Sequence, residues 1–153
     1  MRRILAVVCV VSAVALGGCG ADAEAESPAP APTSALAVDA KAATAAACTE
    51  AVTISKAGAV DFQEGFDDLL KVAVEGDDAA ADAAEKAFRA TLTAWSDKLT
   101  EIAAQPVDAD VKTVLTESAA TVAKVADPAD KTPVNAATEQ LGGIAEKISA
   151  ACA

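Results

Sequence analysis

The sequence predicts an all-α fold: an antiparallel up-down-up-down four-helix bundle over residues 39–153, stapled by a disulfide. Three observations predict this fold. Apolar residues recur at steps of three and four over long stretches, which is the spacing of one helix face. Proline, glycine and aspartate interrupt these stretches at a few places only, and the interruptions set the number of helices. Two cysteines, Cys48 and Cys152, stand near the two ends of the region.

The first predicted helix runs from Asp39 to Gly76. Its seam of apolar and small residues crosses Gly58 without changing phase, so we expect one continuous helix, with a kink at most. The alternative is two helices broken near Gly58, because Asp61 followed by Glu64 resembles a capping box. The seam consists of Cys48, Val52, Ser55, Ala59, Phe62, Phe66, Leu69 and Ala73.

The second predicted helix begins after Asp77 or Asp78, either of which is a favourable N-cap residue. It ends after Gln105, because Pro106 cannot continue a helix. Its seam consists of Ala84, Phe88, Leu92, Trp95, Leu99 and Ile102.

The third predicted helix spans residues 108–126 and is ended by Asp127 and Pro128. Its seam consists of Val111, Val114, Leu115, Val122 and Val125.

The fourth predicted helix opens with Thr132 as N-cap and Pro133 at the first helical position, and it runs to Cys152. Gly142 and Gly143 lie inside it, and each glycine costs about 1 kcal/mol relative to alanine. Their presence suggests a close approach of another helix or a local kink. The seam consists of Val134, Ala137, Leu141, Ile144 and Ile148.

Residues 1–18 have the layout of a secretory signal peptide. Arg2 and Arg3 form a basic start, residues 4–16 are uncharged and apolar, and two small residues precede Cys19. The apolar run is shorter than the roughly 20 residues that span a bilayer, so a permanent transmembrane helix is not expected.

The four residues Leu16-Gly17-Gly18-Cys19 close the apolar run and resemble the lipobox of bacterial lipoproteins. The resemblance covers residues 1–19 only. It implies cleavage between Gly18 and Cys19 and a diacylglyceryl group on the Cys19 thiol. The membrane is then a partner through this lipid, and the chain lies on the extracytoplasmic face of the bacterial cell membrane. The alternative is an ordinary secretory signal with an incidental Cys19.

Residues 19–38 alternate alanine with proline and acidic residues and lack large apolar side chains until Leu36. This composition is typical of a flexible tether. At about 3.1 Å per residue, such a tether reaches about 60 Å.

The cysteines can be assigned once the leader is taken into account. Cys9 leaves with the signal peptide and Cys19 takes lipid, so Cys48 and Cys152 remain as a pair in an oxidising compartment. An up-down-up-down bundle also returns the end of its fourth helix to the start of its first. We therefore predict a disulfide between Cys48 and Cys152.

The charge of the chain argues against nucleic acid as a partner. The formal net charge is −11. Removing residues 1–18 takes away Arg2 and Arg3 and no acidic residue, which leaves 10 Lys+Arg against 23 Asp+Glu, a charge of −13. Such a surface repels phosphate backbones and anionic lipid headgroups.

The sequence holds no histidine and no tyrosine. This excludes the common histidine-dependent nucleophile pairs, haem ligation by histidine, and His/Cys zinc sites. We therefore expect neither an enzyme nor a cofactor.

Acidic residues cluster at two predicted interhelical turns. Weak candidates for a cation site are Glu75, Asp77, Asp78 and Asp82 at one turn, and Asp108 with Asp110 at another. Neither cluster fits the calcium-binding loop, and acids in the first turn of a helix complement the helix dipole. We therefore favour capping and predict no metal.

Trp95 is the only tryptophan in the chain. Its place on the second seam predicts a core position with Phe62, Phe66 and Phe88.

The function expected from these features is a non-catalytic interaction or accessory module of the cell envelope, held by lipid and with an envelope protein as partner. The alternative is a small-ligand or cation-binding lipoprotein that serves a transporter or sensor, which would require a roomy cavity.

Overall fold

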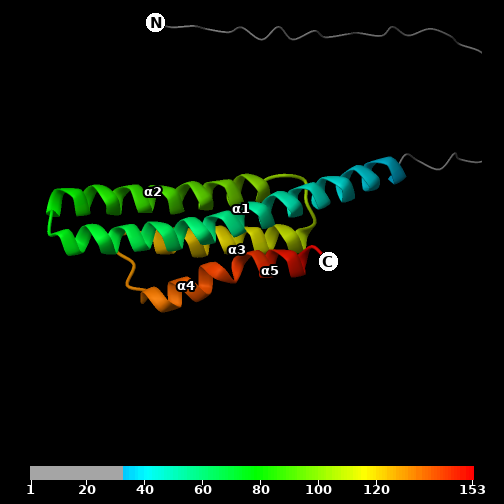
Figure 1. The fold of residues 1–153 in the computed structure, drawn as a ribbon. Coiled ribbons are helices and arrows are strands. Elements are labelled where there is room, and N and C mark those ends of the chain that lie inside the picture. Colours follow the sequence, from blue (N-terminus) through cyan, green and yellow to red (C-terminus); the bar gives the residue numbers. More distant parts are fainter. Residues whose placement is uncertain (1–32) are drawn as a thin grey trace, which may run out of the picture. The chain divides into compact units, whose positions relative to one another are not determined.

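The computed structural model describes residues 33–153, with side chains from residue 40 onward. Within this range the chain is helical, without strands, and folds into four helical arms (Figure 1). The predicted all-α class is confirmed. The predicted signal peptide, Cys19 and the tether up to residue 32 lie outside the described residues. The arms are α1 (Thr33–Glu75), α2 (Asp78–Ala103), α3 (Ala109–Ala126), and a last arm made of α4 (Val134–Gly142) and α5 (Ile144–Ala151).

Helix α1 is continuous through Gly58, so the two-helix alternative is wrong. The apolar seam thus outweighs the capping-box pattern at Asp61. The helix begins at Thr33, so its first turns fall within the segment assigned to the tether. It ends at Glu75 and is followed by Gly76, which has a φ of 75°. Glycine adopts this left-handed conformation without the steric cost that a side chain would add.

Helix α2 begins where predicted. The carboxylate of Asp77 accepts a hydrogen bond from the Ala80 N–H at 3.0 Å and so caps the helix. The helix ends at Ala103, two residues before the predicted Gln105.

The connection into α3 is tied to α1. The backbone N–H of Asp108, the residue before α3, donates to the Thr44 hydroxyl at 3.1 Å. Thr44 is buried, so this bond fixes the start of α3 against the first half of α1. At the other end α3 stops at Ala126, as the Asp127-Pro128 pair predicts.

The start of the last arm differs from the prediction by one residue. Pro133 occupies the N-cap position and Thr132 does not cap the helix. The Thr132 hydroxyl instead donates to the Asp130 carboxylate at 3.1 Å, which stabilises the link before α4.

The last arm is interrupted at Gly143, between α4 and α5. A Cβ atom placed on Gly142 would meet nothing within 4 Å, and one on Gly143 would meet only the carbonyls of Glu139 and Gln140. The expected close approach of another helix is therefore wrong, and the expected local kink is confirmed as a break in the helix. Two adjacent glycines, the weakest helix formers after proline, explain its position.

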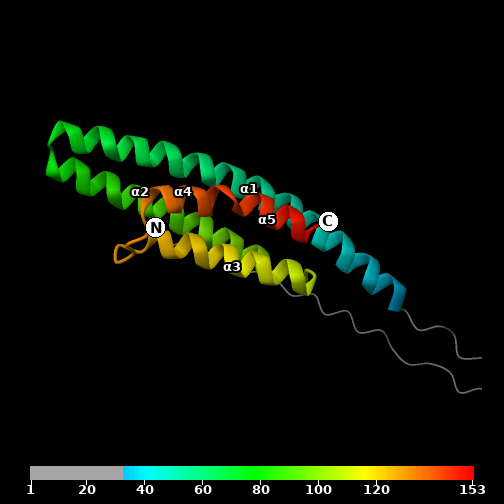
Figure 2. The same cartoon turned by 90° about the horizontal axis from the view of Figure 1, so that it is seen from below.

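The arms lie side by side (Figures 1 and 2). Helix α2 packs along α1 and α3, and α5 packs against α1 and α3. Together they enclose one core, whose largest fully buried side chains are Leu92, Leu99, Leu115, Leu141, Ile144, Ile148 and Val122.

Cys48 and Cys152 form the predicted disulfide, with Cα atoms 6.0 Å apart. The bond joins α1 to the residue that follows α5, so the end of the chain is fixed beside the first arm (Figure 1).

The α1–α2 hairpin extends past the ends of α3 and α4 (Figures 1 and 2). The predicted seam leaves the core in this region. Phe66 and Leu69 are only half-buried and Ala73 is exposed. Val134, predicted to point inward, is 45% exposed at the start of α4. The three α1 positions are uncovered because α3 and α4 stop short of this part of the hairpin. Val134 is exposed because it is the first residue of α4.

Candidate binding groove

The uncovered part of the α1–α2 hairpin forms an open groove of about 470 Å³ between the hairpin and the link that joins α3 to α4. We call it the hairpin groove. Its apolar floor and walls include Phe62, Phe66, Leu69, Leu70, Phe88 and Val134. Its polar rim consists of Asp82, Glu85, Arg89, Asp127 and Asp130.

Helical spacing explains why these residues meet. From α1, Phe62, Phe66, Leu69 and Ala73 follow one another at steps of four, three and four, which places them on one face of the helix. This face continues the seam that packs in the core earlier along α1. The hairpin groove is therefore an extension of the bundle core that α3 and α4 leave open.

Two aromatic rings separate the groove from the core. The ring centroids of Phe62 and Phe88 lie 5.6 Å apart, with the ring planes tilted by 42°. Phe62 is buried, and Phe88 is half-buried. A Cβ atom on Gly65 would lie 2.7 Å from the Phe88 ring, so the glycine lets this ring lie close against the α1 backbone.

Arg89 organises one side of the rim. Its Nη2 atom lies 2.8 Å from the Glu85 carboxylate, one turn earlier on α2. Its Nη1 atom donates to the backbone carbonyl of Ala126 at 3.0 Å, at the end of α3. A cation at the C-terminus of a helix complements its dipole. Arg89 is thus engaged in holding the hairpin to α3.

The link after α3 supplies the other side of the rim. The Asp127 carboxylate accepts from the Ala129 N–H at 2.8 Å, and Asp130 accepts from Thr132. These bonds keep both carboxylates at the groove edge. Together with Asp82 and Glu85 of α2, the rim carries four acidic groups and one arginine that is already paired.

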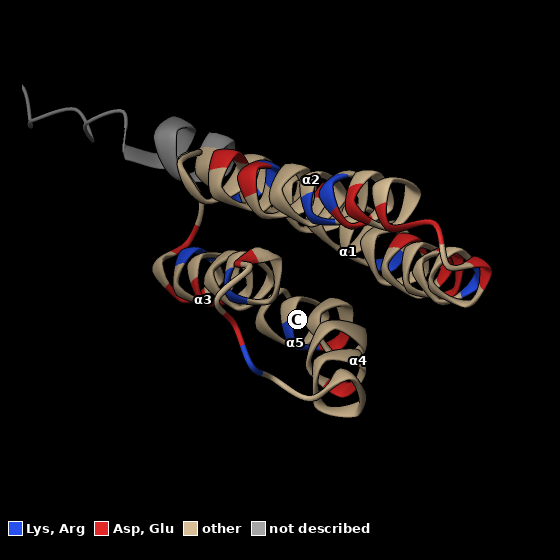
Figure 3. Ribbon diagram, turned by 90° about the vertical axis from the view of Figure 1, so that its left-hand side faces the viewer, with Lys and Arg blue, Asp and Glu red and all other residues tan. Residues whose placement is uncertain are grey.

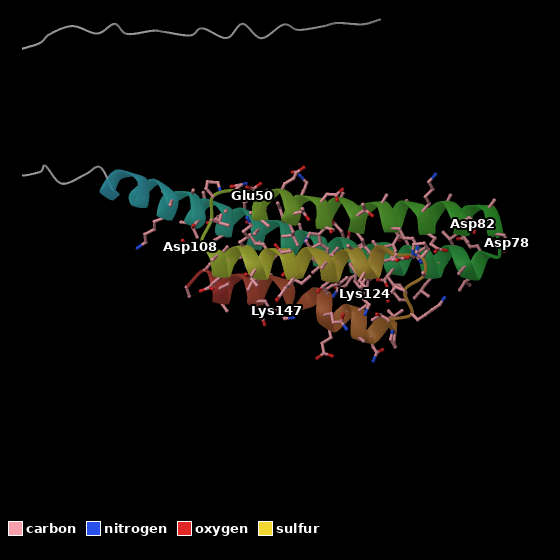
Figure 4. The ribbon with its side chains drawn as sticks, turned by 180° about the vertical axis from the view of Figure 1, so that it is seen from behind. Glu50, Asp78, Asp82, Asp108, Lys124 and Lys147 are labelled. Carbon is pink, nitrogen blue, oxygen red and sulfur yellow. A yellow bond between two sulfur atoms is a disulfide. The ribbon has the colours of Figure 1, made fainter. Side chains whose placement is uncertain are left out.

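The acidic residues proposed as weak cation ligands are spread out. Asp78 and Asp82 lie at the hairpin turn, whereas Asp108 lies at the opposite end of the bundle (Figure 4). Glu75, Asp77 and Asp110 are exposed, and Asp77 is occupied as the cap of α2. Among residues 33–153, no group of three or more acidic or cysteine side chains is arranged to hold a metal ion.

Trp95 is buried, with 4% of its surface exposed. Its ring lies on Gly58 of α1, where an added Cβ atom would be 2.7 Å from the ring carbons Cε2 and Cε3. The prediction of a core position is confirmed. The expected cluster of Trp95 with all three phenylalanines differs in detail. Phe62 pairs with Phe88, and Phe66 lines the groove.

Two buried polar atoms in the described chain have no hydrogen-bond partner, the Ser55 hydroxyl and the Trp95 indole nitrogen. Both belong to the core and neither lines the hairpin groove.

Near the hairpin turn, a hydrogen bond from Lys71 to Asp68, together with the attraction between the two charges, raises the pKa of Lys71 above its ordinary value. Both side chains are largely exposed.

The groove is not among the sites expected from the sequence, although the sequence contains a signal for it. The seams of the first two helices continue through Leu69 and Ala73 and start again at Ala84, whereas the predicted third and fourth helices are too short to face all of these positions. Unequal arm lengths indicate that one end of the seam lacks a facing helix, but they do not show which residues stay exposed.

Comparison with known families, curated proteins and solved structures finds no match to this chain. Within residues 33–153, no helix is long and apolar enough to cross a membrane.

Proposed function

We propose that this protein is a membrane-anchored extracytoplasmic lipoprotein whose helical domain is a non-catalytic interaction module, and that the hairpin groove is its binding surface. The observation that carries the proposal is the groove: apolar side chains from α1, α2 and α4 left open at one end of the bundle. A concave, largely apolar cleft with a few polar groups at its edge is the usual form of a binding site.

The anchor rests on the lipobox resemblance at Leu16-Gly17-Gly18-Cys19. The bundle topology we propose is antiparallel up-down-up-down, which the disulfide between the first arm and the chain end supports. The groove begins at Phe62, 29 residues after the start of α1 at Thr33, a distance of about 44 Å along the helix. The binding surface is therefore remote from the end of α1 that the anchor precedes.

The rim chemistry favours binding over catalysis. Arg89 is paired with Glu85 and with a helix carbonyl, and Asp127 and Asp130 accept hydrogen bonds from their own link. These groups fix the shape of the groove and its negative charge.

Site-specific photo-crosslinking in intact cells tests whether a partner binds at the hairpin groove. In one variant of the full chain, a photoreactive amino acid replaces Leu70, which lines the groove and is 50% exposed. In the control variant it replaces Val60, which is 52% exposed on the same helix but does not line the groove. We expect a discrete crosslinked product from position 70 only, lost when Phe66→Ala alters the groove floor. Equal products at both positions would contradict the proposal.

The anchor has its own test. Cys19→Ser should abolish incorporation of radiolabelled fatty acid and leave the leader uncleaved. Normal maturation of this variant, with the unaltered protein in the aqueous phase of a detergent extraction, would refute lipid attachment.

A second candidate function is binding of a small molecule in the same groove. The volume of about 470 Å³ favours it, because small-molecule sites commonly measure about 300–1,000 Å³. Thermal-shift screening of the full chain against metabolites and cations tests this candidate. A stabilising compound whose effect is lost in Leu70→Gln and kept in Val60→Gln would support it.

A further inference from the structure

We infer that the hairpin groove accepts one amphipathic helix of about three turns, with an apolar stripe and basic flanks, from a partner protein. This inference rests on the proposed function and specifies the partner. The helix completes the bundle where α3 and α4 stop.

The length of the groove sets the length of the occupant. Its α1 side runs from Phe62 to Ala73, about 17 Å along the helix axis. A partner helix of about 12 residues matches that length. Because both groove walls at the hairpin are helices with an apolar stripe, the occupant packs as a helix in a groove, with anchors at steps of three and four.

Charge complementarity indicates which residues flank the apolar stripe of the partner helix. Asp82 and Glu85 of α2 line the groove, and so do Asp127 and Asp130 of the link between α3 and α4. Figure 3 shows further acidic residues at the hairpin turn. The one rim cation, Arg89, is already paired with Glu85. Lysine or arginine beside the apolar stripe of a partner helix therefore meets carboxylates without an ion-pair partner both on α2, at Asp82, and on the link, at Asp127 and Asp130.

The openness of the groove favours a helix over a small molecule. Leu70 and Val134 stand on its edge and remain 50% and 45% exposed. A small ligand at the floor leaves these side chains in water, whereas small-molecule sites usually bury most of the ligand surface. A helix laid along the groove covers both residues.

A second copy of the chain is a poor occupant. The whole chain carries a formal charge of −11, and a symmetric contact through this surface places two acidic rims face to face. Like charges at an interface oppose association.

The test uses the full mature chain in phosphatidylcholine nanodiscs, with protein-free nanodiscs as the blank. The probe is a dye-labelled 12-residue peptide of leucine, alanine and lysine, with leucine at positions 1, 4, 5, 8 and 12. Two further peptides serve as comparisons, one with glutamate in place of lysine and one with the same composition in scrambled order. Binding is measured as the change in fluorescence anisotropy.

Two matched pairs of variants locate the binding. Leu70→Gln should weaken binding of the lysine peptide about fivefold, because it removes apolar contact at the groove edge. Val60→Gln, equally exposed on the same helix, should leave binding unchanged. Asp82→Asn should weaken binding about two- to fivefold, the effect of one exposed ion pair, whereas Asp97→Asn on the same helix should not.

The lysine peptide is expected to bind at least about tenfold more tightly than the glutamate and scrambled peptides. Equal binding of the scrambled peptide, or equal effects of Leu70→Gln and Val60→Gln, overturns the inference. Tetraphenylphosphonium, a small apolar cation, is the small-molecule probe. If it binds, if Leu70→Gln weakens that binding, and if the peptide does not bind, the inference of a helical occupant is overturned while the groove keeps its binding role. If neither probe nor the cellular crosslink depends on position 70, the proposed function fails as well.

Discussion

Gly58 of α1 and Trp95 of α2 are in direct apposition, with the indole ring occupying the space that a side chain at position 58 would need. Seven residues along each helix, Gly65 and Phe88 repeat the arrangement. The two helices are therefore held in one antiparallel register by two aromatic rings, each seated on a glycine. Gly58, which resembles a helix break when only the sequence is considered, is a point of close contact between these helices.

The first prediction concerns this glycine. In an exposed helix, replacing glycine by alanine usually stabilises by about 0.5 to 1 kcal/mol. Gly58→Ala should instead lower the free energy of unfolding by about 1 to 3 kcal/mol, because the methyl group overpacks against Trp95. Urea denaturation followed by circular dichroism measures the change.

Gly142→Ala is the matched control for Gly58→Ala. A Cβ atom at position 142 meets nothing within 4 Å, so the ordinary stabilisation of about 0.5 to 1 kcal/mol should appear. Equal gains in both variants would show that the Trp95 ring does not lie on Gly58.

The second prediction concerns Trp95 itself. Trp95→Ala should cost about 3 to 5 kcal/mol, the range for emptying a large aromatic site in a core. Because Trp95 is the only tryptophan, the native fluorescence of the unaltered chain reports this site alone. We expect blue-shifted emission that acrylamide quenches poorly. Red-shifted and freely quenched emission would place the ring at the surface.

The helices were predictable because their signals are local and redundant. Gly76 and Asp77 mark one turn and Pro128 marks another, and these agree with the apolar steps on either side. The disulfide was predictable from the expected return of the last helix to the first, together with the number of cysteines that the leader leaves available. At Pro133, by contrast, two adjacent residues compete for the cap, and the side chain of Thr132 is held by Asp130.

The groove was not predictable by the same means. A seam shows which face of a helix is apolar, but it does not show whether another helix covers that face. The exposure of Leu70 and Val134 depends on how far α3 and α4 extend beside the hairpin, which is a property of the assembled bundle. The partial burial of Phe66 has the same origin.

The third prediction concerns Ser55, which is fully buried without a hydrogen-bond partner for its hydroxyl among the described residues. Burying an unpaired hydroxyl costs free energy, and alanine is the better helix former. Ser55→Ala should therefore stabilise the protein by about 1 kcal/mol.

Ser96→Ala is the control for Ser55→Ala. The Ser96 hydroxyl is also buried on a helix, but it donates to the Ala119 carbonyl of α3 at 2.9 Å. Its removal should cost about 0.5 to 1.5 kcal/mol, so the two serine variants should shift the urea midpoint in opposite directions. Destabilisation by both would mean that the Ser55 hydroxyl has a partner.

The last prediction concerns the bond between Cys48 and Cys152, which are 104 residues apart in sequence. In the loop-entropy model, a bridge closing about 100 residues stabilises by at most about 4.7 kcal/mol, chiefly by restricting the unfolded chain. Reduction should thus lower the melting temperature while helicity at low temperature persists, because the apolar seams supply the core. The double variant Cys48→Ser/Cys152→Ser should match the reduced protein in a thermal scan. Thiol labelling of the unreduced, denatured mature chain should detect no free thiol at either position, and labelling of both cysteines would show that the bridge is not formed.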